Sequence, residues 1–161
     1  MIAERQVNQM NDRHLFRAKR TDNGEWVKGY LYRLSENHPP FIMLSARCGE
    51  SYAVEPSTIC QCTGLKDKIG KLIWENDITK LVLSDGEVRY FKVSFKKFIR
   101  KVLCHPDFYD DVAKVELNAV CFEWNGYELL PCIDEDGVSD VAKMEVIGNI
   151  FDNPELLEVG E

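Results

Sequence analysis

The residues of this chain that are best suited to chemistry are its cysteines and histidines, of which it has six and three. Cys60 and Cys62 are the one close pair, and both thiols would point to the same side of a strand because alternate strand residues share a face. A zinc ion would need two further ligands, and the other cysteines show no second spacing of the CxxC type. We therefore expect thiols that act as small apolar side chains, and neither a metal nor another cofactor.

Catalytic constellations need a nucleophile, a base and an orienting acid that meet in space. Cys104 and His105 are adjacent, and adjacent side chains of a strand point to opposite faces, which disfavours a dyad. Asp107, Asp110 and Asp111 offer the oxygen ligands that a divalent cation prefers, although exposed acidic loops have the same composition. We interpret the chain as a protein that is not an enzyme.

A basic stretch, KVSFKKFIRK, runs from residue 92 to residue 101. We call its five cations the basic ribbon: Lys92, Lys96, Lys97, Arg100 and Lys101. Basic side chains that alternate with aromatic ones suit a nucleic-acid backbone or an acidic partner. Charge runs at strand spacing are more often the solvated face of a sheet, and we favour that interpretation. Nucleic-acid binding through the ribbon is the alternative function.

An aromatic row is formed by Trp26, Tyr30 and Tyr32, whose even spacing places them on one face of a strand. Such a row binds a peptide or a stacked base, or it fills a core or an interface. We favour a core or an interface. A partly exposed row would serve self-association most simply, because symmetric homo-oligomers are common and sheet edges need covering.

Short apolar runs separated by turn residues predict that β-hairpins carry these side chains. The turn signals are Thr21-Asp22-Asn23-Gly24, Asp85-Gly86 and Asn125-Gly126. The last of these joins a strand over residues 115–124 to one over residues 127–132. Gly29, inside the strand after the first turn, predicts a bulge or a close backbone approach.

The stretch TGLKDKIGKLIWENDIT, residues 63–79, has the most distinctive pattern in the chain. Gly64 and Gly70 bracket a charged segment and favour a tight turn there. The residues that follow predict a strand, a polar turn at residues 75–77 and a second strand. We expect a rigid bend between paired strands, which acts as scaffolding and not as a reactive loop.

This stretch resembles the hallmark of the YopX-like family of phage and prophage proteins. Two further segments agree with the family: RHLFRAKR at residues 13–20, followed by WVKGYLY, and MEVIGNIFDNPELL at residues 144–157. At Asn76 the family more often has glycine, so the turn must accept left-handed geometry, as asparagine can. The resemblance implies a fold and a phage origin, without a reaction.

Size, composition and charge exclude several protein classes. With 161 residues, 45% hydrophobic and 29% charged, the chain is typical of a soluble globular protein. Its net charge of −7 argues against a chain-wide surface for duplex nucleic acid. No apolar run approaches the roughly 18 residues of a membrane span, and the first residues lack a hydrophobic signal core. We expect a cytoplasmic protein with no membrane contact, and the phage resemblance implies that its cytoplasm is that of a bacterial host cell.

The sequence thus predicts a mainly β fold of two packed small subdomains. Residues 1–12 form a flexible tail, residues 13–62 an N-terminal β subdomain, and residues 63–161 a bent, SH3-like β-barrel that ends in a short helix near residues 153–157. The predicted function is that of a non-enzymatic phage or prophage accessory protein. It would work by homo-oligomer assembly or by binding a phage or host protein.

Overall fold

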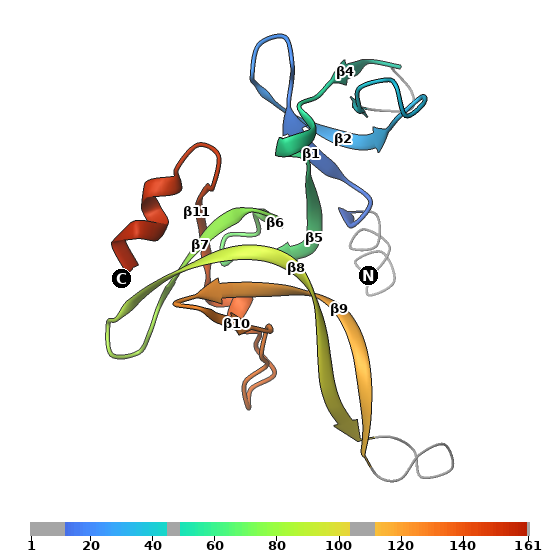
Figure 1. Ribbon diagram of the computed structural model, residues 1–161. Helices are drawn as coiled ribbons and strands as arrows, with labels where there is room; N and C mark the ends of the chain where they lie inside the picture. Colours follow the sequence, from blue (N-terminus) through green and yellow to red (C-terminus); the bar gives the residue numbers. More distant parts are fainter. Residues whose placement is uncertain (1–11, 45–48, 104–111, 161) are drawn as a thin grey trace, which may run out of the picture.

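The computed structural model describes residues 12–44, 49–103 and 112–160, and this part of the chain is mainly β-structure, as predicted (Figure 1). The strands are β1 (Phe16–Lys19), β2 (Trp26–Tyr32), β3 (Phe41–Met43), β4 (Ser51–Ala53), β5 (Cys60–Lys66), β6 (Leu72–Trp74), β7 (Asp77–Val82), β8 (Val88–Leu103), β9 (Val112–Trp124), β10 (Tyr127–Leu129) and β11 (Glu145–Asn149). Short 3-10 helices are η1 (Pro56–Thr58), η2 (Asp140–Lys143) and η3 (Pro154–Gly160).

These strands form two antiparallel sheets. The first has the order β4-β3-β2-β1-β5-β6, and the second has the order β10-β9-β8-β7-β11. The second sheet is strongly bent and forms half of a barrel, with β10 and β11 at its edges among the described residues. Its SH3-like character stays a prediction.

All three predicted hairpins are present. β1 pairs with β2, β7 with β8, and β9 with β10, each across one of the predicted turns. In the last turn Asn125 has φ 45° and Gly126 has φ 76°. Positive φ at both central residues gives the turn the twist that two antiparallel strands need.

Gly29 confirms the predicted close backbone approach. A Cβ atom added at Gly29 would lie 2.1 Å from the carbonyl oxygen of Met43 in the neighbouring strand β3. Only a residue without a side chain allows β2 and β3 to pair at this distance.

The predicted boundary between residues 62 and 63 falls inside β5. This strand pairs with β1 on one side and with β6 on the other, so the first sheet continues as far as Trp74. The division into two subdomains therefore stays a prediction. Residues 1–11 of the predicted tail lie outside the described residues.

The C-terminal helix is a correction to the sequence prediction. The segment forms the 3-10 helix η3, and no described residue of it is α-helical. Forming the first turn of an α-helix costs conformational entropy, and a segment this short gains few further hydrogen bonds to offset that cost. Short segments therefore often adopt 3-10 geometry. The other short helix of the second half, η2, is capped by Ser139, whose hydroxyl accepts a hydrogen bond from the Val141 amide.

Three apolar clusters stabilise the two sheets. The largest lies on the bent sheet, where the rings of Phe91 and Phe122 meet edge to face at 6.3 Å. A second, around Ile42, covers the first sheet. The third combines Cys60, Cys62 and Trp74 with Phe151 from the C-terminal segment, so it joins the sheets at their meeting point.

Candidate functional site

The basic ribbon is divided between the two faces of β8. The register with β9 is continuous from Lys92 to Leu103, so side chains alternate without a bulge. Lys92, Lys96 and Arg100 therefore lie on one face, and Lys97 and Lys101 lie on the other. The five cations do not form one continuous basic surface.

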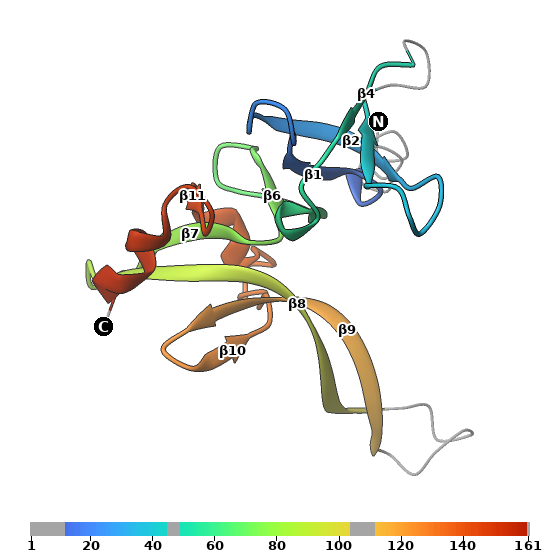
Figure 2. The same ribbon diagram turned by 45° about the horizontal axis from the view of Figure 1, so that its top comes forward.

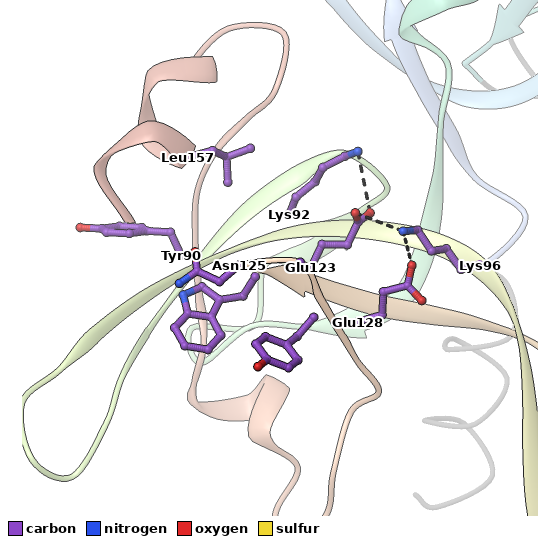
Figure 3. Close-up of a pocket in the computed structure, with 10 residues that line it drawn as sticks. Tyr90, Lys92, Lys96, Glu123, Asn125, Glu128 and Leu157 are labelled. Carbon is purple, nitrogen blue, oxygen red and sulfur yellow. Dashed lines mark hydrogen bonds and ion pairs between the residues drawn. The ribbon is translucent and has the colours of Figure 1, made fainter. Parts of the chain in front are cut away.

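Lys92 and Lys96 line a cleft on the face formed by β8, β9 and β10, with a cavity of about 480 Å³ (Figure 3). Its walls are made by these three strands, the turn between β9 and β10, and the C-terminal segment. The lining residues are Tyr90, Lys92, Lys96, Glu123, Trp124, Asn125, Gly126, Tyr127, Glu128 and Leu157.

The charges in this cleft are paired with one another. Lys96 Nζ lies 2.6 Å from Glu128 Oε1 and 3.2 Å from Glu123 Oε2. Lys92 Nζ lies 3.8 Å from the other oxygen of Glu123 (Figure 3). Two lysines and two glutamates cancel, so the cleft attracts neither anions nor cations through net charge.

The ion pairs also keep these groups ionised. The hydrogen bond to Glu128, followed by that to Glu123, raises the pKa of Lys96 above its ordinary value. Partial burial alone would raise the pKa of Glu123, but the Ser94 hydroxyl and the Lys96 ammonium bring it below its ordinary value. A lysine held protonated in this way is neither a nucleophile nor a base.

An aromatic wall completes the cleft. The rings of Trp124 and Tyr127 stack with centroids 6.2 Å apart, and the Arg89 guanidinium lies 4.4 Å from the Trp124 centroid. A surface that combines aromatic rings with paired charges is suited to bind another protein, because protein interfaces are enriched in aromatic residues and carry a polar rim. The arrangement offers binding, and the described groups lining it offer no activated nucleophile.

Sequence reasoning missed Glu123, Trp124, Tyr127 and Glu128 as cleft residues. The signal was the Asn125-Gly126 turn, because a two-residue hairpin fixes the strand register. That register places Trp124 opposite Tyr127 and Glu123 opposite Glu128.

The three side chains of the aromatic row have different surroundings in the structure. Trp26 packs against Phe151 with centroids 5.8 Å apart, and its indole N–H donates a hydrogen bond to Asp152. Tyr32 stacks on Phe41, while Tyr30 is 44% exposed. Trp26 and Tyr32 thus serve packing within the chain, and an interface role for the row stays a prediction.

The cysteine pair is buried in the core. Cys60 and Cys62 are both fully buried, and burial raises the pKa of each thiol above its ordinary value. Buried protonated thiols behave as small apolar groups. Among the residues that the structure describes, no group of three His, Cys, Asp or Glu side chains could hold a metal ion. The pair Cys104–His105 and the cluster Asp107, Asp110 and Asp111 lie outside the described residues.

A protein-family model described as YopX protein matches residues 15–158. The chain belongs to the YopX family. The match includes every described strand of this YopX chain, from β1 to β11. No curated protein matches the chain. No helix in the described part of the YopX chain is long and apolar enough to cross a membrane.

The family hallmark of this YopX chain is scaffolding, as predicted. The Asp67 carboxylate is buried and accepts hydrogen bonds from the amides of Ile69, Lys71 and Val146. The Thr63 hydroxyl donates to the Ile73 carbonyl at 2.7 Å. These polar side chains form hydrogen bonds with backbone groups of the bend. This stabilises the fold, because a buried backbone amide without a hydrogen-bond partner costs free energy.

Asn76 confirms the left-handed geometry predicted for the turn before β7. It adopts φ 64°, the left-handed geometry that glycine accepts most readily and asparagine tolerates. Its amide donates to the Val93 carbonyl, and its carbonyl accepts from the Ile150 amide. The turn before β7 is therefore bonded to β8 and to the C-terminal segment.

Proposed function

We propose that this YopX-family protein is a non-enzymatic accessory protein, encoded by a phage or prophage, that works through self-assembly and protein binding. The observation that carries the proposal is the long hairpin of β8 and β9. The outer half of this hairpin extends beyond the other strands of the second sheet, and we call it the arm (Figures 1 and 2). The bent second sheet, an SH3-like scaffold in this proposal, holds the base of the arm.

The arm, residues 97–103 and 112–118, exposes apolar side chains on one face. Ile99 is 65% exposed, Leu103 is 85% exposed, and Val112, directly opposite Leu103, is 52% exposed. Ile99 and Leu103 share this face because they are four residues apart on one strand. On this face the apolar side chains alternate with two lysines of the basic ribbon. A two-stranded hairpin is marginal in water by itself, and exposed apolar side chains on it suit an interaction site.

A second copy of the chain is the proposed occupant of this face. Closed symmetric homo-oligomers are the commonest assemblies, and a two-fold arrangement would bring the apolar faces of two arms together. Phage origin and action in the cytoplasm of the host cell are part of the same proposal and rest on the family. The charge pairing of Lys92, Lys96 and Lys97 with glutamates supports a protein surface better than a nucleic-acid one.

The oligomeric state tests this proposal directly. Light scattering after size-exclusion chromatography should give a mass above that of one chain at micromolar concentration. The double variant Ile99→Ser, Leu103→Ser should shift the mass to that of one chain, because it removes the apolar contact from both arms. Leu34→Ser is the matched control, since Leu34 is 69% exposed but lies outside the arm.

A wild-type protein that is monomeric at this concentration would contradict the assembly. So would a double variant that keeps the mass of the wild type while its thermal unfolding is unchanged.

A further inference from the structure

A second cleft lies between the two sheets, apart from the cleft on β8, β9 and β10. Its cavity is about 350 Å³, with β5 on one wall and the bend of β8 and β9 on the other (Figure 1). Leu65, Phe95, Val120 and Pro131 make much of its lining apolar. Clefts between packed units are common ligand sites, and this volume takes a small molecule or one peptide side chain.

Arg13 is the one charged side chain among the described residues that line this cleft. It forms no ion pair with a described residue, whereas Arg17, Arg20 and Arg89 each have an acidic partner. Arg13 is exposed, so its guanidinium is accessible at the mouth of the cleft, and a guanidinium without an acidic partner can bind an anion through charge-assisted hydrogen bonds.

Few other polar groups of this cleft are free to bind a ligand. The Thr63 hydroxyl already donates to the Ile73 carbonyl and accepts from the Leu65 amide. The Gln61 side-chain amide donates to the Arg13 carbonyl. Asn118, on β9, also lines the cleft, and its side-chain amide offers a second donor.

The backbone of β5 holds Arg13 at the cleft. The Cys62 amide donates to the Leu15 carbonyl at 2.9 Å, and the Gln61 side chain reaches the Arg13 carbonyl at 3.2 Å. Gly64 leaves room for the arginine stem, because a Cβ atom there would lie 2.8 Å from Arg13 Cγ. The backbone of Arg13 and the start of its side chain are therefore held against β5.

We propose that this cleft binds the free carboxylate of an apolar ligand. Arg13 pairs with the carboxylate through its planar fork of N–H donors, and the apolar wall holds the group attached to it. The C-terminal residue of a protein and a small apolar acid both have this chemistry. The site borders the base of the arm at Asn118, but it uses neither Ile99 nor Leu103 and does not depend on arm-mediated assembly.

Four probes test the proposal and distinguish the two sources. N-acetyl-leucine is the small acid, and a hexapeptide that ends in leucine with a free carboxylate represents a protein C-terminus. The C-terminal amide of each is its uncharged counterpart. Each probe is titrated into the isotope-labelled full chain, and amide shifts in the nuclear magnetic resonance spectrum report the site and the affinity.

We expect both acids to shift the amides of Thr63, Asn118 and Val120, and to bind at least about tenfold more tightly than their amides. Arg13→Gln should remove that difference, and Arg13→Lys should restore part of it. Arg33→Gln is the matched control, because Arg33 is an exposed arginine of the same subdomain. Tighter binding of the peptide acid than of N-acetyl-leucine identifies a protein C-terminus, and equal binding identifies a small acid.

Three results would overturn the proposal. These are equal binding of the acids and their amides, shifts that map outside the cleft, and the absence of shifts with all four probes at millimolar concentration. An unchanged preference for the acid in Arg13→Gln would overturn the role of Arg13.

Discussion

At the scale of single residues, an ion pair with a buried carboxylate joins Arg17 on β1 to Asp77 at the start of β7. The Asp77 carboxylate is 1% exposed, pairs with Arg17 Nη2 at 2.5 Å, and accepts a hydrogen bond from the Trp74 amide at 2.8 Å. Burial raises the pKa of Asp77, and the Arg17 guanidinium opposes this rise. The guanidinium also lies 4.9 Å from the ring centroid of Trp26. Asp77 is therefore one of the links between the two sheets.

Asp77→Ala should lower the free energy of unfolding by about 3–5 kcal/mol, because it leaves a buried guanidinium without its counter-charge. Urea unfolding followed by tryptophan fluorescence measures the change. Asp136→Ala, at an exposed acidic turn, is the control and should change the free energy by less than about 0.5 kcal/mol. Equal stability of the two variants would mean that Arg17 finds another partner or water.

At the scale of elements, close strand pairing and turn geometry determine the shape. The β2–β3 pair depends on one glycine at the point of closest approach, and the β8–β9 pair keeps its register over the whole arm. The first feature allows β2 and β3 to pair closely in the first sheet. The second carries apolar side chains away from the body, where they are available to a second copy.

Gly29→Ala should lower the free energy of unfolding by about 2–3 kcal/mol, because the new methyl group overlaps the Met43 carbonyl and forces β2 and β3 apart. Lys28→Ala is the control, since Lys28 is an exposed neighbour in the same strand. Chemical denaturation measures both. A loss of less than about 0.5 kcal/mol in Gly29→Ala would show that the strands separate without cost.

At the scale of the whole molecule, the C-terminal segment ties the bent sheet to the first sheet. Asp152 follows β11, and its carboxylate binds Lys19 Nζ at 2.5 Å and the Trp26 indole N–H at 2.7 Å. Both partners belong to the first sheet. Together with the third apolar cluster, this contact makes the orientation of the sheets depend on electrostatics as well as on packing.

Asp152 should make the protein sensitive to acid. The bond to Lys19, followed by those to Asn149 and Trp26, lowers the pKa of Asp152 from 3.8 to about 2. The charged carboxylate therefore stabilises the folded chain above its unfolded pKa of 3.8, and the stabilisation is lost as the pH falls through about 2. Because the side chain is 38% exposed, solvent screening limits the effect to about 1 kcal/mol.

Asp152→Asn tests this at several pH values. At neutral pH the variant should unfold with about 1 kcal/mol less free energy than the wild type, and this difference should shrink as the pH falls below 3.8. Glu155→Gln, an exposed carboxylate in the same segment, is the control. A difference that stays constant across the acid range would show that Asp152 acts through its shape and not through its charge.

The sequence by itself determined the mainly β class, the three hairpins and the scaffolding role of residues 63–79. Each of these depends on a few neighbouring residues, such as Asn125-Gly126, whose backbone preferences act locally. Only the tertiary structure decided which charges meet. Arg17 and Asp77 are 60 residues apart, and the cleft on β8 also uses side chains from β9, β10 and η3. Such contacts depend on how the strands bend and pack. The lysines of β8 therefore do not by themselves predict which glutamates of the neighbouring strands they will pair with.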